Sequence, residues 1–431
     1  MYVRNWLGRA LRVYRRMGFP RAGFLALIVS LNLLGMAVAA PTNVGATASS
    51  LPLGNQAIPP TFFGMHVHYT HWDLPWPAIP FGAERLWDAE VQWADVNPAS
   101  GVFDWTHMDQ IVAANATHGT TVLYTLGQTP LWASSRPGAP GLTGPGHSAP
   151  PRDINDWRAY VRAVAARYKG RIAAYELWNE PNGTDQFWTG SVRDLIDLAA
   201  VARDTIKAID PSALLVGPAT TGNVGGSGVG YLDQLLGAGL GKYVDVIAYH
   251  SYPNPGDAPE DLVNLTGQIK ATMSKYGIQK PLWDSESNWM SKQFTDHLAQ
   301  AYVARQELMH WYLGYSRHYW YAWDDHGVTL QLSRADDVTP TPGAVAYKAV
   351  QGWMVGGVMS TCQRSASGVW TATLIKDGLP RHVAWLETDS ATTPFAVPTA
   401  WAARRVTDLN GNQTAIVGGS VRLDAAPVLL S

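Results

Sequence analysis

The sequence predicts an α/β fold, namely a (β/α)8 TIM barrel followed by a smaller all-β domain. Three observations support this prediction: short strand-like runs recur from residue 61 to residue 323, helical patterns separate them, and only strand-like segments follow residue 356. Near-continuous apolar runs are typical of strands covered on both faces, and their alternation with helices is typical of a parallel barrel. A doubly wound open sheet is the alternative, but no glycine-rich dinucleotide turn follows the first run.

Helices are expected where apolar residues recur at helical spacing between the strand-like runs. In residues 153–170, Trp157, Val161 and Val164 share one face, and Gly170 ends the helix. Similar patterns cover residues 191–211, 295–314 and 341–357. The strands expected around them cover residues 61–68, 83–87, 120–127, 171–180, 213–219, 244–250, 280–286 and 317–323.

The C-terminal part of the chain has a different pattern. From about residue 357, short β-like segments alternate with turns, and Asn410-Gly411 suggests a hairpin. We therefore expect a barrel over residues 41–356 and a β-sandwich-like domain over residues 357–431. Because no Ser-, Thr- or Pro-rich linker joins them, the second domain should pack on the barrel as a structural partner. Sugar binding by that domain is the alternative.

The N-terminal segment has the features of a secretory signal. The first 23 residues contain six arginines and no acidic residue, and an uncharged run from Ala22 to Ala39 follows. That run is also long enough to span a membrane if it is not removed. We favour cleavage near Ala39, so residues 1–40 are expected to be a signal peptide and the rest to be secreted or extracytoplasmic. A membrane is a partner only if the segment stays uncleaved.

Composition excludes several classes of protein. Hydrophobic residues make up 46% of the chain and charged residues 15%, which is typical of a globular protein. A formal net charge of −2 gives no electrostatic argument for nucleic acid. The 19 tryptophans and 18 tyrosines are mostly core, but such rings also stack on sugars. The single Cys362 cannot form an intrachain disulfide.

Two glutamates end expected strands. Glu180 closes the fourth strand-like run and is followed by Pro181, while Glu286 closes the seventh. Because the carboxyl ends of barrel strands face one cleft, the two carboxylates should lie across that cleft from each other. Such a pair can hydrolyse a glycosidic bond if one member is protonated and the other is ionised. Glu286 should be the ionised member, and Glu180 should have the raised pKa.

The residues around these glutamates resemble those of a known family. "ELWNEPN" (176–182) is similar to the strand that carries the acid/base in clan A glycoside hydrolases, and "TLGQTPLWAS" (125–134) and "WDSE" (283–286) resemble glycoside hydrolase family 39. The resemblance covers roughly residues 60 to 431. It implies a retaining mechanism with Glu180 as acid/base and Glu286 as nucleophile, and it implies that Asn179 binds the sugar 2-hydroxyl.

The resemblance also points to further site residues. Arg85, after the second strand, is similar to the clan's arginine that binds the nucleophile and lowers its pKa. His250 and Tyr252 in "AYHSYP" resemble the clan's contacts to the sugar and the nucleophile. Trp323 is a candidate platform beneath the sugar. A surface salt bridge for Arg85 and ordinary packing for His250 and Tyr252 are the alternatives.

Other residues near the expected cleft allow more than one interpretation. In "HVHYTH" (66–71), His66 and His68 share a face, but no third ligand at metal-site spacing accompanies them. We therefore expect no metal and no cofactor, and consider both histidines as sugar contacts. Trp132 could line a subsite or be structural. Glu176 is expected in a buried ion pair, and Asp284 is expected one layer below Glu286 on the same side of its strand.

These residues lead to one function and two alternatives. The leading hypothesis is a secreted retaining hydrolase of β-glycosidic bonds in a polysaccharide, endo-acting on bacterial exopolysaccharide, because long Pro/Gly-rich loops follow two strands. An exo-β-xylosidase is the alternative within the class. A non-catalytic polysaccharide-binding barrel is the alternative outside it.

Overall fold

The computed structural model describes residues 51–72, 74–183, 187–222, 227–254, 256–289, 293–326 and 330–431. Leu51–Ser431 forms one compact unit. The expected signal peptide lies outside the described residues, so its cleavage stays a prediction. Within the described ranges, no helix is both long enough and apolar enough to cross a membrane.

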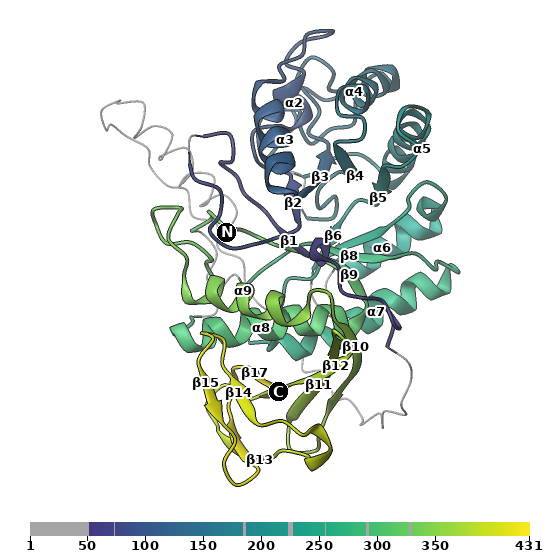
Figure 1. Ribbon diagram of the computed structural model, residues 1–431. Helices are drawn as coiled ribbons and strands as arrows, with labels where there is room; N and C mark the ends of the chain where they lie inside the picture. The colour runs from purple at the N-terminus through teal and green to yellow at the C-terminus, as the bar shows by residue number, and fades with distance from the viewer. Residues whose placement is uncertain are drawn as a thin grey trace. The chain divides into compact units, whose positions relative to one another are not determined.

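A parallel sheet forms the barrel that the sequence predicts (Figure 1). Its strands have the order β5-β4-β3-β2-β1-β9-β8-β7-β6. Their bounds are β1 Phe63–Met65, β2 Ala83–Leu86, β3 Thr121–Leu126, β4 Ile172–Leu177, β5 Leu214–Val216, β6 Thr220–Thr221, β7 Ile247–His250, β8 Leu282–Ser287 and β9 Tyr315–Trp320. Each of the eight expected runs contains or overlaps one of them, and the fifth run is divided between β5 and the position just before β6.

The two edge strands of that order close the ring. β5 pairs with β4 and β6 pairs with β7, while single bridges join Val216 to Val246 and Asn179 to Ala219. β5 and β6 are therefore two pieces of one interrupted strand, and the ring has the eight positions of a (β/α)8 barrel.

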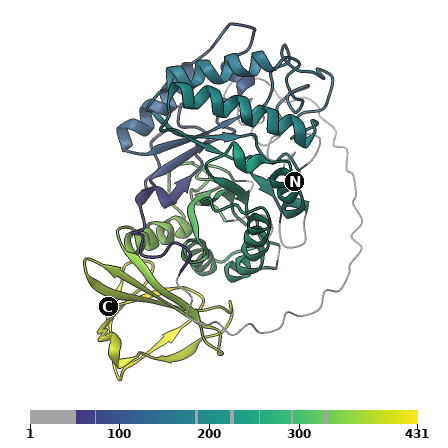
Figure 2. The same ribbon diagram turned by 90° about the vertical axis from the view of Figure 1, so that its right-hand side faces the viewer.

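Helices surround the strands (Figures 1 and 2). The α-helices are α2 Trp93–Val96, α3 Thr106–His118, α4 Ile154–Arg167, α5 Val192–Ile209, α6 Ser227–Gly237, α7 Leu262–Lys275, α8 Asp296–Leu313 and α9 Pro342–Met354. The short 3-10 helices are η1 Pro60–Phe62, η2 Leu240–Lys242, η3 Pro259–Asp261 and η4 Thr399–Trp401. The four helices expected from periodicity are α4, α5, α8 and α9. Caps define their starts: Ser191, Thr295 and Thr341 each accept a hydrogen bond from a backbone N–H of the first turn.

The C-terminal region is antiparallel, as expected. One sheet has the order β10-β11-β12-β17-β14-β15, and β13 pairs with β16. The bounds are β10 Val358–Arg364, β11 Val369–Lys376, β12 Leu379–Leu386, β13 Thr393–Ala396, β14 Arg405–Thr407, β15 Gln413–Ala415, β16 Ser420–Leu423 and β17 Val428–Leu430. The expected hairpin joins β14 to β15, with Gly411 at φ 84° and its N–H bonded to the Asp408 carbonyl. The domain boundaries themselves stay a prediction.

Candidate active site

A local break in the β4 pattern turns two neighbouring side chains into the cleft. Trp178, just after β4, has φ 58°, an unfavourable value for a bulky residue. Its indole N–H donates to the Phe187 carbonyl at 2.7 Å, which anchors the ring outside the barrel. The side chains of Asn179 and Glu180 therefore both contact residues of the cleft, whereas consecutive residues of a regular strand point to opposite faces. Glu180 also has a positive φ, of 42°, and strained backbone of this kind is concentrated at functional sites.

A register shift in β8 likewise changes which side chains face the cleft. The pairing with β9 is irregular between Asp284 and Ser287. Glu286 therefore faces the cleft, whereas Asp284 bonds to His310 on α8 at 2.8 Å. The expectation that Asp284 lies on the same side as Glu286 was wrong, because strict alternation is lost at this bulge.

The two glutamates lie close together and are almost completely buried. One carboxylate oxygen of Glu180, one of Glu286 and one ring nitrogen of His250 all lie within 4.8 Å of one another. Glu180 is 2% exposed and Glu286 is 1% exposed. His250 Nδ1 lies 2.8 Å from Glu180 Oε1, and the Tyr252 hydroxyl donates to Glu286 Oε1 at 2.8 Å. The structure thus brings four of the expected site residues and their partners into one cluster.

Arg85 contacts several side chains of this cluster. Its guanidinium donates to Glu286 Oε2 at 2.8 Å, to Asn179 Oδ1 at 2.7 Å and to Glu176 Oε2 at 2.7 Å. Both Arg85 and Glu176 are buried, so the expected ion pair of Glu176 is present. A surface salt bridge is excluded for Arg85. The same side chain therefore orients the expected nucleophile and the amide expected to bind the sugar.

The electrostatics of the pair are set by burial and close charge. Burial raises the pKa of Glu286; the charge of Glu180 adds to the increase, while the charges of His250 and Arg85 oppose it. The upward direction for Glu286 differs from our expectation. Arg85 and Tyr252, the two donors on Glu286, favour its ionised form, which the expected role of nucleophile requires.

Two opposing effects act on the pKa of His250. Burial alone lowers its pKa, but the charge of Glu286 and the hydrogen bond to Glu180 outweigh burial and raise it. A protonated His250 donates from Nδ1 to Glu180. Its Nε2 is buried and has no hydrogen-bond partner in the described part of the chain, so it is available to a sugar hydroxyl.

The two histidines of the first loop have different surroundings. His66 Nε2 lies 3.0 Å from the Ser285 carbonyl, and its buried Nδ1 has no partner among the described residues. Burial, with the charge of Arg85, lowers the pKa of His66, so a neutral ring can accept a hydrogen bond there. His68 instead has both nitrogens occupied by carboxylates, Asp324 at 2.6 Å and Asp88 at 3.0 Å. Both ring nitrogens of His68 are therefore paired with carboxylates, and its role as a sugar contact stays a prediction.

Asp88 is a site residue that the sequence reasoning missed. Its carboxylate receives His68 on one oxygen and the Tyr321 hydroxyl on the other, at 2.7 Å. Its side chain is 14% exposed, whereas Glu180 and Glu286 are almost completely buried. Its position two residues after β2 could have indicated it, since residues beyond strand ends form the active face of a barrel.

The two tryptophans expected in subsites are both anchored by their indole N–H groups. Trp323 follows β9 and donates to the Asp337 carbonyl at 2.9 Å, and its ring lines a pocket with Tyr69 and Trp76. Trp132 donates to the Asn97 carbonyl at 2.9 Å beyond α2. Its ring meets Trp93 edge-on, a contact that agrees with the structural alternative, and a subsite role stays a prediction.

Comparison with known proteins finds glycoside hydrolases. Residues 88–276 match the model of glycosyl hydrolases family 39. The chain is 28% identical over 117 residues to a beta-xylosidase of Caldicellulosiruptor saccharolyticus, covering 25% of this chain and 23% of that protein. It is 30% identical over 84 residues to a beta-xylosidase of Geobacillus stearothermophilus, covering 18% and 17%. These matches thus span less than a quarter of either relative.

Solved structures show the same fold at low identity. A family 39 glycoside hydrolase of Bacteroides cellulosilyticus superposes with a TM-score of 0.65 at 21% identity, covering 81% of this chain and 75% of that one. A family 39 beta-xylosidase of Caulobacter crescentus gives a TM-score of 0.60 at 17% identity, covering 88% and 98%. A family 30 endoxylanase of Clostridium papyrosolvens gives 0.58 at 12% identity, covering 88% and 98%.

Proposed function

We propose that this chain, a clan A glycoside hydrolase most similar to family 39, hydrolyses β-glycosidic bonds with retention of anomeric configuration. The observation that supports this most strongly is the separation of Glu180 and Glu286, whose nearest oxygens lie within 4.8 Å. Retaining enzymes hold their carboxyl groups about 5–5.5 Å apart, whereas inverting enzymes need about 6.5–9.5 Å to admit water.

In the first step, the Glu286 carboxylate attacks the anomeric carbon. The bond between that carbon and the leaving oxygen breaks, and Glu180 transfers its proton to this oxygen. A covalent glycosyl ester on Glu286 results. Arg85 and Tyr252 hold the two oxygens of Glu286, so the attacking group is oriented before the substrate binds.

In the second step, water replaces the leaving group. Glu180, now ionised, takes a proton from the water as the water oxygen attacks the anomeric carbon. The ester bond breaks and the Glu286 carboxylate is restored. His250, bonded to Glu180 at 2.8 Å, stabilises the charge that Glu180 carries between the two steps.

Stereochemistry tests the proposal. Proton NMR of early hydrolysis of a 4-nitrophenyl β-glycoside should show the β-anomer forming first, with the α-anomer appearing only by mutarotation. An initial α-anomer would contradict retention. No hydrolysis across a broad panel of aryl glycosides and polysaccharides, with tight polysaccharide binding, would favour the non-catalytic alternative.

The finer proposal is endo-action on an exported polysaccharide. It is supported by the long loop 127–153 after β3, at the end of the barrel where the carboxylates lie. The exo-β-xylosidase alternative is supported by the names of the curated relatives. Chromatography of early products separates them, because endo-action releases a series of oligosaccharides and exo-action releases only monosaccharide. Secretion is proposed from the N-terminal sequence, and the size of the exported protein would test it.

A further inference from the structure

A buried polar cluster lies on the outer side of β8, between that strand, β9 and α8. Asp284 Oδ2 receives the Ser287 hydroxyl at 2.8 Å and lies 2.8 Å from His310 Nε2. Ser287 Oγ lies 3.0 Å from His318 Nε2, and His318 Nδ1 lies 2.9 Å from Glu307 Oε1. All five side chains are buried. Buried networks of this kind rigidify their surroundings when their groups are paired.

This cluster does not have the geometry of a metal site, although Asp284, His310 and His318 converge within 4.8 Å. The two imidazole rings are stacked, with centroids 3.9 Å apart and planes inclined by 14°. The lone pair of an imidazole nitrogen lies in the plane of its ring. Two nearly parallel, stacked rings cannot both direct such a lone pair at one ion.

The other oxygen of Asp284 points to backbone groups of the active site. Asp284 Oδ1 accepts from the N–H of Glu286 at 3.2 Å and from the N–H of Ser251 at 3.4 Å. Ser251 stands between His250 and Tyr252 in the chain. One carboxylate therefore ties the end of β8, which carries the expected nucleophile, to the end of β7, which carries both of its neighbours.

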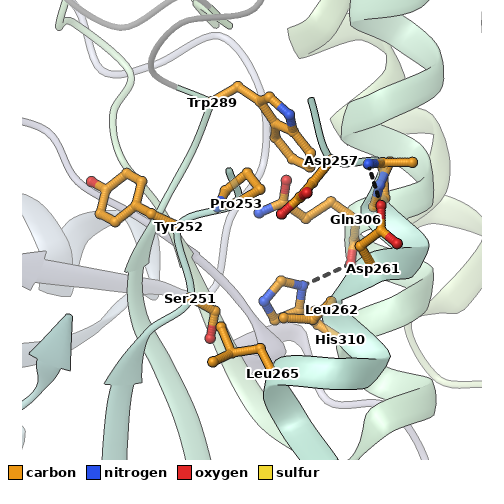
Figure 3. A pocket seen from close by; sticks show the side chains of 12 residues that line it. Ser251, Tyr252, Pro253, Asp257, Asp261, Leu262, Leu265, Trp289, Gln306 and His310 are labelled. Atoms are coloured by element: carbon orange, nitrogen blue, oxygen red, sulfur yellow. Dashed lines mark hydrogen bonds between the residues drawn. The ribbon is translucent and has the colours of Figure 1, made fainter. Parts of the chain in front are cut away.

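Figure 3 shows the Ser251–Pro253 segment beside Gln306 and His310 of α8. His310 and Gln306 lie on one side of the Ser251–Pro253 segment, and Tyr252 points away from them. His310 Nδ1 lies 2.8 Å from the Gln306 carbonyl, so the ring is fixed at both nitrogens. Asp284 thus contacts α8 through one oxygen and the ends of β7 and β8 through the other.

We infer that Asp284 is a positioning residue that sets the distance between Glu286 and the pair His250 and Tyr252. This inference rests on the proposed function. Its charge is maintained in the interior: burial raises the pKa of Asp284, but the hydrogen bond from His310 and the charges of the neighbouring histidines lower it to about 2. An ionised carboxylate accepts all four of its hydrogen bonds, and charge-assisted bonds hold geometry more tightly than neutral ones.

Asp284→Asn tests the inference. The amide keeps one acceptor oxygen for the backbone N–H groups, but it presents an NH2 group to His310 and Ser287. The contacts by which residue 284 holds the ends of β7 and β8 together should therefore shift. With 4-nitrophenyl β-D-xylopyranoside, or the best aryl glycoside of the panel, kcat should fall about 10²-fold, as expected for a misplacement near 1 Å. KM should change less than about threefold, because ground-state binding does not depend on the attack angle.

The matched control is Asp210→Asn. Asp210 is also buried and also accepts backbone N–H groups, from Gly170 at 2.8 Å and Ser212 at 3.2 Å, but it lies at the end of α5, away from the cleft. It should lower the unfolding midpoint and leave kcat unchanged. If Asp284→Asn does not fold, Ser287→Ala carries the test, since it removes one donor to Asp284 and should lower kcat about tenfold.

The outcomes separate the two claims. An active wild-type enzyme whose kcat is unchanged in Asp284→Asn, or whose kcat falls equally in Asp210→Asn, overturns the positioning role alone. An inactive wild-type protein overturns the proposed function and this inference together.

Discussion

The two glutamates of the cleft should respond differently to removal. Glu286→Ala should abolish turnover of every substrate, because no glycosyl ester can form. Glu180→Ala should lose about 10²–10⁴-fold on substrates with poor leaving groups, which is the usual contribution of general acid–base catalysis. Aryl glycosides with good leaving groups need no proton, so their first step should be nearly unaffected. Steady-state kinetics on a series of aryl glycosides measures this contrast.

Azide identifies which glutamate forms the ester. It needs no general base, so it should accelerate the slow second step of Glu180→Ala and yield the β-glycosyl azide. The wild-type enzyme, whose base is intact, should show no comparable acceleration. An α-glycosyl azide from Glu180→Ala would mean that the two roles are reversed.

Tyr252 should influence the pH at which the nucleophile is ionised. Tyr252→Phe removes the 2.8 Å bond to Glu286 Oε1, which favours the carboxylate. The pKa of Glu286 should therefore rise further, and the acid limb of kcat/KM should move to higher pH. Loss of a hydrogen bond to a charged group, ~1.5–3 kcal/mol, corresponds to a fall of about tenfold or more in kcat/KM.

Tyr168→Phe is the control for that measurement. It also removes a bond from a phenol to a carboxylate, Asp109 at 2.9 Å, but on the outer helices. Its pH profile should match that of the wild type. If the acid limb in Tyr252→Phe stays in place or moves to lower pH, Tyr252 does not stabilise the ionised nucleophile.

Single residues of the site were predictable where a strand end and a motif coincide. Glu180 and Glu286 are of this kind, and the resemblance to the clan added Arg85. Asp88 was missed, since its orientation depends on His68 and Tyr321 from two distant loops. The direction of Asp284 was also wrong, because a bulge that reverses strand parity leaves no mark in the apolar pattern.

At the scale of elements, the strands and the helices α4, α5, α8 and α9 followed from periodicity, whereas α3, α6, α7 and the interruptions did not. In the run 213–219, Gly217-Pro218 marks the end of β5, but nothing in the run shows that the strand resumes as β6 at Thr220. The break requires Thr220 and Thr221 to pair with β7 while Leu214–Val216 pairs with β4. Such a choice depends on how the ring closes, which is a property of neighbouring strands and not of the segment.

One ion pair joins three elements and should be important for stability. Arg305 on α8 bonds to Glu260 in η3 and to the Glu387 carbonyl beyond β12, and Glu260 also accepts from the Trp385 indole at 2.7 Å. Arg305 is completely buried. Arg305→Ala leaves Glu260 largely buried without its main partner, so the free energy of unfolding should fall by about 3–5 kcal/mol.

Arg364→Ala is the control for this prediction. Arg364 pairs with Glu387 on the surface, where its side chain is 48% exposed. Exposed pairs contribute roughly 0–1 kcal/mol, so urea unfolding of Arg364→Ala should be close to that of the wild type. Equal losses in both variants would mean that the buried position of Arg305 gives it no special role.

At the scale of the whole molecule, the barrel and the C-terminal strands share one hydrophobic core. Met309 of α8 and Met354 of α9 belong to the same buried cluster as Met359, Trp370 and Trp385 of β10, β11 and β12. Gly356 and Gly357 at the junction also exchange backbone hydrogen bonds with Ile58, before β1. The sequence indicated this packing only through the missing linker, since which faces meet cannot be read from either segment.

Removal of residues 357–431 should therefore disable the barrel. It would expose the apolar faces of α8 and α9 that are now buried. Large exposed apolar patches cause aggregation. It would also leave Arg305 without its Glu387 contact and Glu260 without Trp385. The shortened chain should be found in aggregates by size-exclusion chromatography and should show no hydrolysis of the best aryl glycoside. Trp401→Ala, in the part of the β region that packs away from the barrel, should stay soluble and active. A soluble shortened chain with wild-type kcat would show that the C-terminal strands are an independent module and that their shared core with the barrel is dispensable.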